Sequence, residues 1–296
     1  MAICFTYKLI AERGKDTSTN TFLIHFNFNA IADLLLAFTI IFFCKFLHWR
    51  FFLDFILECQ WMKIAFGPLL NSTIAASVIG CTYTVVNRYY AICKPLIFRK
   101  KWTNTVSLCL CFFQFFVPLL LFLYNFWFSA KNIYVKSNDF YAFSIPFNNV
   151  RLINNCILFV IVSISIYITI YQNLIIFKRF SDIVNNLSSK ERKKKHLMMF
   201  YMVATTLCLV ILFFEQIARL IFGIVKYEHG TYYTTFLLYW ILPTLNIMQP
   251  ISTLIMSKQI RLYFLSFYFK PFLPKHFNLT ENTTTIKTVK AVLKEI

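Results

Sequence analysis

Hydrophobic residues in this chain occur in long, continuous runs. Six runs reach roughly 20 residues or more, the length that an α-helix needs to cross about 30 Å of hydrocarbon. Because the runs are continuously apolar, they do not show the alternating segments of about ten residues that are typical of membrane barrel strands. The pattern predicts an all-α, polytopic bundle of transmembrane helices. The predicted spans cover residues 22–44, 62–86, 105–128, 152–177, 197–225 and 232–256.

Composition leads to the same class of protein. Of the 296 residues, 58% are hydrophobic and 14% are charged, whereas soluble domains have roughly 45–50% and 25%. A single water-soluble core of this size cannot hide so much apolar surface, so most of the chain must face lipid. We expect a multi-pass protein of the plasma membrane, with the lipid bilayer as its main partner.

The formal net charge of +18 is unevenly distributed among the loops. The segments before the first run, after the second, after the fourth and after the sixth carry most of the Lys and Arg, which by the positive-inside rule predicts that both termini are cytoplasmic. The basic residues at 192–195 favour an orientation signal over a nucleic-acid site, so no nucleic-acid partner is expected. Residues 257–270 suit an amphipathic helix along the membrane, and residues 271–296 suit a flexible cytoplasmic tail.

The residue patterns of common enzymes do not occur. The five glycines form no phosphate-binding loop, and the five histidines have no metal-ligand spacing. The nine cysteines are best explained as small apolar packing residues. We therefore expect neither an enzyme nor a cofactor.

The clearest motif closes the second run. Residues 87–96 read N-R-Y-Y-A-I-C-K-P-L and resemble the D-R-Y-x-A-I-x-x-P-L stretch of rhodopsin-like G-protein-coupled receptors. The resemblance implies that Asn87, Arg88 and Tyr89 form a switch on the G-protein side, with Arg88 released towards a heterotrimeric G protein on activation. Asn87 replaces the usual Asp and cannot supply the negative partner of a pH-sensitive latch. The alternative is an arginine that snorkels to the membrane boundary.

Two further segments extend this resemblance. Residues 29–35, N-A-I-A-D-L-L, are similar to a signature of the family's second helix, and residues 249–253, Q-P-I-S-T, stand where the family has N-P-x-x-Y. A carboxylate near mid-membrane is costly, so Asp33 is expected to face the bundle interior and to have polar partners. The resemblance implies a central polar network with a sodium ion at Asp33. Its members would be Asp33, Ser77, Asn246, Gln249 and Pro250.

The motifs also indicate a discrepancy in the number of helices. The second-helix motif lies in the first run and the third-helix motif in the second, so the family's first helix is missing. We predict a truncated or mis-spliced form of a seven-span receptor. The layout and motifs are similar to nematode chemoreceptors of serpentine class gamma and the related Srv groups. That resemblance implies a chemosensory receptor in a sensory-cell membrane that transduces binding of a small molecule to a G protein.

A ligand is expected to enter from the side opposite the basic loops. Glu215 and Arg219 are spaced i,i+4 within the fifth run, so they either orient a polar ligand or form a structural pair. For the other candidates, interhelical hydrogen bonding or interfacial anchoring is the alternative. The resemblance implies a disulfide from the third helix to the second extracellular loop, but the loop at 129–150 has no cysteine to pair with Cys59, and Cys156 is the nearest alternative. The outer vestibule is therefore expected to be less constrained than in most relatives. The candidate pocket residues are Asn71, Asn154, Glu215, Gln216, Arg219 and Trp240.

Two other classes of function stay open. In a small-solute transporter or channel, Asp33, Glu215 and Arg219 would be pathway residues; the lack of visible internal repeats speaks against it. In a non-functional fragment, a bundle without its first helix would lose packing and be degraded.

Overall fold

The structure, a computed structural model, describes residues 17–135, 140–184 and 189–256. The predicted amphipathic helix at 257–270 and the tail at 271–296 lie outside the described residues. Residues 1–16 also lie outside the described residues, and the prediction of a missing first helix depends on them. That prediction therefore stays untested.

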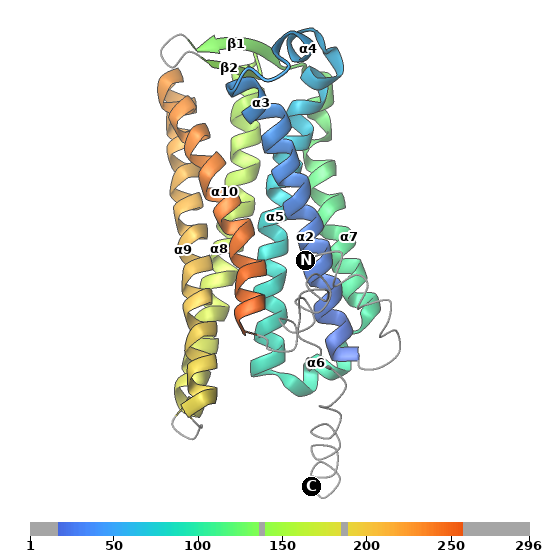
Figure 1. Cartoon of the computed structure of the whole chain (residues 1–296), viewed down its shortest axis with the longest axis vertical. Coiled ribbons are helices and arrows are strands. Elements are labelled where there is room, and N and C mark those ends of the chain that lie inside the picture. The colour runs from blue at the N-terminus through green and yellow to red at the C-terminus, as the bar shows by residue number, and fades with distance from the viewer. Residues whose placement is uncertain (1–16, 136–139, 185–188, 257–296) are drawn as a thin grey trace, which may run out of the picture. The chain divides into compact units, whose positions relative to one another are not determined.

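Six long helices run side by side (Figure 1). Each predicted run falls on one of them, although the first run continues beyond its helix into a short π turn and the third into a short 3₁₀ turn. Among the described residues, five helical segments are long and apolar enough to cross a membrane, so the prediction of an all-α polytopic bundle is confirmed. The long helices are α2 (Thr17–Ile40), α5 (Gln60–Cys93), α7 (Asn104–Phe122), α8 (Asn148–Val184), α9 (Ser189–Val225) and α10 (Glu228–Met256).

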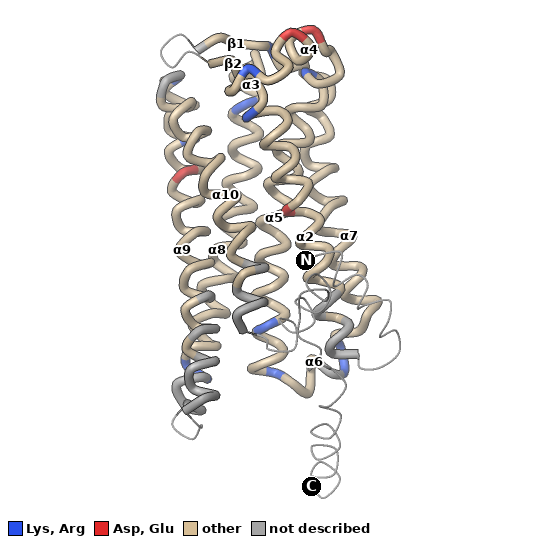
Figure 2. The backbone as a smooth tube through the Cα atoms, in the orientation of Figure 1, with Lys and Arg blue, Asp and Glu red and all other residues tan. Residues whose placement is uncertain are grey.

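Short elements connect the long helices at the two ends of the bundle. One end, which we call the hairpin end, carries the antiparallel strands β1 (Lys131–Val135) and β2 (Phe140–Ser144), and the opposite end, the α6 end, carries α6 (Pro95–Lys101) (Figure 1). Lys and Arg lie mainly near these two ends, with few charges between them (Figure 2). The remaining short elements are η1 (Ile41–Lys45), α3 (Phe46–His48), α4 (Leu53–Glu58) and η2 (Leu123–Trp127).

Of the described helices, four extend beyond the predicted spans at the α6 end. α2 begins at Thr17 rather than at residue 22, and α5 continues to Cys93 rather than to residue 86. α8 continues to Val184 rather than to residue 177, and α9 begins at Ser189 rather than at residue 197. The added residues include Lys, Arg and Glu, which have good helix propensity but end an apolar run. Hydropathy therefore indicates where a helix enters the membrane and not where the helix ends.

The core forms around α5, which packs against α2, α7 and α8, while α9 packs between α8 and α10. From α2 and its continuation, Leu36, Ile40 and Phe43 are buried at 0–2% exposure. On the same helix Leu34 and Phe38 are 62% and 61% exposed. A helix that is apolar all round suits a protein with lipid on one side and partner helices on the other.

α5 and α7 approach closely where α5 has small residues. A Cβ at Gly80 would clash with the side-chain amides of Asn29 on α2 and Gln114 on α7. Gln114 Nε2 donates to Asn29 Oδ1 and to the carbonyl oxygen of Ala76, both at 3.1 Å. Small residues let membrane helices approach until such interhelical hydrogen bonds can form. This buried amide pair fixes three helices together.

The strands form a hairpin that the sequence analysis did not predict. β1 pairs with β2 from Lys131 opposite Ser144 to Val135 opposite Phe140. A hydrogen bond joins the base of the hairpin to α5, because the Ala130 amide donates to the Lys63 carbonyl at 2.9 Å. Whether the outer vestibule is less constrained than in most relatives stays a prediction. The segments K-N-I-Y-V and F-Y-A-F-S are rich in β-branched and aromatic residues, which was the local signal for strands.

No disulfide is involved in this arrangement within the described part of the chain. The eight cysteines described there, Cys59 and Cys156 among them, are free. Asn132 of β1 forms a second hydrogen bond, in which its side-chain nitrogen donates to the Leu57 carbonyl of α4 at 3.2 Å. Hydrogen bonds to α4 and α5 thus hold this hairpin at its base.

Candidate functional site

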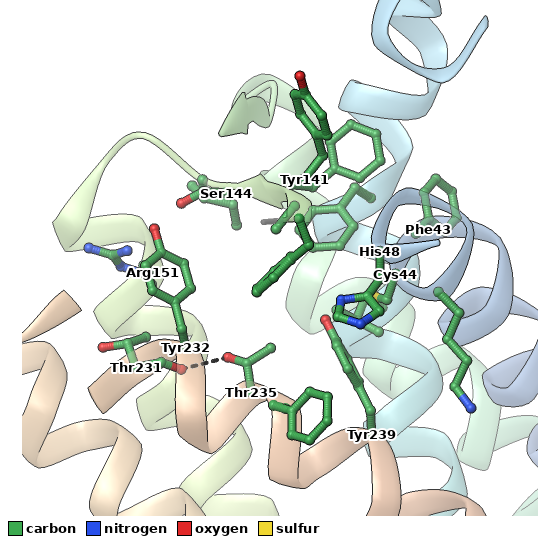
Figure 3. A pocket seen from close by; sticks show the side chains of 18 of the residues that line it. Phe43, Cys44, His48, Tyr141, Ser144, Arg151, Thr231, Tyr232, Thr235 and Tyr239 are labelled. Atoms are coloured by element: carbon green, nitrogen blue, oxygen red, sulfur yellow. Dashed lines mark hydrogen bonds between the residues drawn. The ribbon is translucent and has the colours of Figure 1, made fainter. Parts of the chain in front are cut away.

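A cavity of about 290 Å³ opens at the hairpin end (Figure 3). Strand β2 and the segment Phe43–Trp49 line it together with α5, α8, α9 and α10. Small-molecule sites in proteins commonly have volumes of about 300–1,000 Å³. The cavity is close to the lower end of this range, which restricts it to a small organic ligand. Residues far apart in the sequence form it.

Aromatic side chains make up much of the wall. Phe43, Phe66 and Phe143 come from η1, α5 and β2, and the ring centroids of Phe66 and Phe143 are 5.2 Å apart. Tyr239 and Trp240 of α10 line the cavity as well. Such rings offer a large apolar surface with few conformations to lose on binding. The wall thus suits an apolar ligand body.

The π-helical turn η1 shapes one side of the cavity. It interrupts the α-helical continuation of α2 at Ile41–Lys45 and contributes Phe43, Cys44 and Lys45 to the lining. Lys45 Nζ lies 5.8 Å from the ring centroid of Trp49 and 5.7 Å from that of Trp240. A π turn changes the direction of every following side chain and occurs often at functional sites. Here it turns a lysine towards two indole rings beside the cavity.

Four of the six predicted pocket residues line the cavity: Asn71, Asn154, Arg219 and Trp240. Asn71 also donates to the Gly67 carbonyl of its own helix at 2.8 Å. Trp240 is 63% exposed, so it lies at the rim.

The other two, Glu215 and Gln216, are buried but do not line the cavity. Glu215 Oε1 lies 2.7 Å from Nη2 of Arg219, and Gln216 Nε2 donates to Glu215 Oε2 at 2.6 Å. The geometry has features of both roles suggested for Glu215 and Arg219, orientation of a ligand and formation of a structural ion pair. Arg219 lines the cavity, whereas Glu215 does not line it and forms an ion pair with Arg219.

Asn154 takes part in an amide pair that the sequence did not indicate. Asn154 Nδ2 donates to Asn125 Oδ1 and Asn125 Nδ2 donates to Asn154 Oδ1, both at 2.9 Å. Tyr124 Oη donates to Asn154 Oδ1 at 2.6 Å. Each buried amide group is thereby partnered, as burial requires. Asn154 accordingly connects α8 to η2 in addition to lining the cavity.

Several lining residues were not among the predicted candidates. Figure 3 shows Arg151 and Tyr232 on one side of the opening, with Cys44, His48 and Tyr239 on the other. For Arg151 a signal existed, because basic residues are uncommon on the side of the membrane that the positive-inside rule depletes. The aromatic residues carried no such signal in a chain with 36 Phe and 16 Tyr.

Midway along the bundle the structure brings Asp33, Ser77 and Asn246 together. Ser77 Oγ donates to Asp33 Oδ1 at 2.7 Å. With its amide nitrogen facing them, Asn246 donates to Asp33 Oδ1 at 3.2 Å and to Ser77 Oγ at 3.1 Å. This orientation is required because the Ser77 hydroxyl has one hydrogen and cannot donate to Asp33 and Asn246 at once. The three side chains join α2, α5 and α10.

At the α6 end, Asn87 is buried and Arg88 and Tyr89 are half-buried. Tyr89 packs against a small cluster formed by the buried residues Ile176 of α8 and Met202 of α9. Met248 of α10 packs against the same cluster. We call Tyr89, Ile176, Met202 and Met248 the closing cluster. It holds four helices together beside Arg88.

A family comparison identifies the chain. It matches the serpentine-type seven-transmembrane GPCR chemoreceptors named Srv over residues 4–269, nine-tenths of its length. The chain belongs to the Srv chemoreceptor family. Membership confirms the resemblance to serpentine receptors and the multi-pass membrane location, and it points to a receptor rather than an enzyme. A search of curated proteins finds no match.

The sodium ion that the resemblance implies at Asp33 of the Srv receptor stays a prediction. Asp33 and Ser77 supply a carboxylate and a hydroxyl oxygen, ligand types that hard cations take, whereas Asn246 presents its amide nitrogen to both. No group of three or more His, Cys, Asp or Glu that would hold a metal occurs among the described residues. The side chains of Gln249 and Pro250 lie outside the described part of α10, so their place in this network stays a prediction.

A contact near the α6 end had no local signal in the receptor's sequence. Trp102, just after α6, donates from Nε1 to His25 Nε2 of α2 at 3.3 Å. Cys111 Sγ lies 3.7 Å from the other ring nitrogen of this buried histidine. The ring of Tyr90 lies 5.2 Å from Trp102. The loop that follows the N-R-Y motif is therefore docked onto α2.

Proposed function

We propose that this Srv receptor binds a small molecule in the hairpin-end cavity and passes the signal to a heterotrimeric G protein at the α6 end. One observation carries the proposal. Each of α5, α8, α9 and α10 contributes to both places: Asn71, Arg151, Arg219 and Tyr239 line the cavity, and Tyr89, Ile176, Met202 and Met248 form the closing cluster.

This shared use of helices offers a physical route for the signal. A ligand that changes the spacing of the helices at the cavity acts on the same rigid elements that meet beside Arg88. Receptors of this kind signal when an inner surface is exposed to the G protein. Separation of the closing cluster would expose such a surface. The polar contact among Asp33, Ser77 and Asn246 lies between the two places and connects α10 to α2 and α5.

The experiment uses the full chain in membranes with purified heterotrimeric G protein and measures nucleotide exchange while a library of small organic molecules is added. Two variants separate binding from signalling. Ser144→Trp fills the cavity from β2 and should abolish the response to any active compound. Arg88→Ala should leave binding of that compound intact and abolish exchange.

Four results would contradict the proposal. A response that persists in Ser144→Trp would place the ligand elsewhere, and a response unchanged in Arg88→Ala would remove the assigned role of that arginine. Ligand-dependent ion flux without G protein would support the transporter or channel alternative. Failure of the chain to reach the cell surface would support the non-functional fragment.

A further inference from the structure

Basic side chains gather around the cavity. Lys45, Arg151 and Arg219 all line it, as does His48. Neither Asp nor Glu occurs among the lining residues that the structure describes. The cavity is thus positively charged along its wall.

The partners of these cations differ. Arg219 is neutralised by Glu215 at 2.7 Å. Lys45 lies over two indole rings, which attract a cation without cancelling its charge. Arg151 donates from Nη2 to the side-chain oxygen of Asn148, which is uncharged. Two half-buried cations at the cavity therefore have no carboxylate partner among the described residues.

Membrane topology does not explain these charges. The positive-inside rule places orientation signals on the cytoplasmic side and leaves the opposite loops poor in Lys and Arg. Lys45 and Arg151 lie on that opposite side, and Arg219 lies within the fifth predicted span. The orientation of the chain in the membrane does not require these charges, and they line one cavity. They therefore indicate a negatively charged ligand.

We infer that the cavity selects a small amphipathic organic anion, a carboxylate attached to an apolar body. The anionic group pairs with Lys45 or Arg151, and the body packs against Phe66, Phe143 and Tyr239. The volume of about 290 Å³ restricts the ligand to a small molecule. The inference rests on the proposed function in one respect, because it names the chemistry of the same ligand site.

The test measures binding of three probes of equal shape to the purified full chain in nanodiscs of phosphatidylcholine. The probes are 4-phenylbutanoate, 4-phenylbutanamide and 4-phenylbutylamine, which differ in charge at one end. The carboxylate should bind about tenfold or more tightly than the amide, because hydrogen bonds to charged groups are stronger than neutral ones. The amine should bind most weakly.

Variants then locate the anion. Lys45→Gln and Arg151→Gln should each lower the affinity for the carboxylate by roughly tenfold and leave the amide unchanged, which also shows that the variant is folded. Lys131→Gln is the matched control, since Lys131 is an exposed base of β1 that does not line the cavity. It should leave all three affinities unchanged.

A carboxylate that binds no better than the amide overturns the inference, and so does a loss in Lys131→Gln equal to that in Arg151→Gln. These outcomes leave the proposed receptor function standing, because a neutral ligand would still signal. The reverse case is also distinguishable. If the carboxylate shows the expected preference but neither it nor Arg88→Ala changes nucleotide exchange, the anion site stands and the proposed function fails.

Discussion

Removal of one charge from the Glu215–Arg219 pair should destabilise the bundle far more than removal of both. Glu215 is 3% and Arg219 8% exposed. One carboxylate oxygen of Glu215 lies 2.7 Å from Arg219 Nη2, and the other accepts a hydrogen bond from Gln216 at 2.6 Å. In Arg219→Met the carboxylate stays buried without its cation. In Glu215→Gln the guanidinium stays buried without its anion.

The expected magnitude follows from this burial. Breaking a buried ion pair by removing one partner costs about 3–5 kcal/mol, whereas replacing both partners with uncharged residues is roughly neutral. For a bundle of this size, about 3–5 kcal/mol corresponds to a fall in Tm of about 6–20 °C. The double variant Glu215→Gln/Arg219→Met should therefore recover most of the stability that either single variant loses.

The assay follows thermal unfolding in detergent micelles with a maleimide dye that fluoresces when it reacts with a thiol. Cys44, Cys81 and Cys111 are buried and become reactive only when the bundle opens. If both single variants shift Tm by less than about 2 °C, the pair is solvated and the reasoning from burial is refuted. A double variant that loses as much as the two singles combined would refute it equally.

Three further changes test other parts of the bundle. Gly80→Ala should destabilise by about 1–3 kcal/mol because its Cβ has no room, whereas Gly223→Ala, with its nearest outside neighbour 3.7 Å away, should be neutral or stabilising in the same unfolding assay. If sodium binds at Asp33, sodium chloride should raise Tm relative to choline chloride, and Asp33→Asn should remove the difference. Met202→Ala should raise basal nucleotide exchange roughly tenfold or more, because it weakens the closing cluster; unchanged exchange would show that the cluster does not restrain signalling.

The positions of the long helices were predictable because the bilayer sets a simple length requirement. Which face of each helix is buried and which faces lipid could not be predicted. Leu34 and Leu36 are equally hydrophobic, yet one is 62% exposed and the other is fully buried. In water, polar residues mark the outer face of a helix, but lipid removes that contrast. Which leucine faces lipid depends on the neighbouring helices, which the local sequence does not specify.

Residues of the candidate site could be predicted where their side chains differ chemically from the neighbouring residues in the sequence. Arg219, Asn71 and Asn154 stand out because polar side chains are rare in apolar runs, and all three line the cavity. Tyr239 lines the same cavity and had no contrast with its aromatic surroundings. The contact between His25 and Trp102 joins residues 77 positions apart and follows only from the packing of α2 against the loop after α6.

The replacement of Asp by Asn at position 87 changes what has to restrain Arg88. An adjacent carboxylate would hold the arginine by charge, and the latch would open when the carboxylate gains a proton. Asn87 is neutral at every pH, so restraint of Arg88 as proposed would come from other contacts, and the closing cluster contains the adjacent residue Tyr89. Packing of this kind responds to the spacing of helices and not to protons. Under the proposed function, a ligand in the cavity that the same four helices line at their opposite ends would act on this spacing.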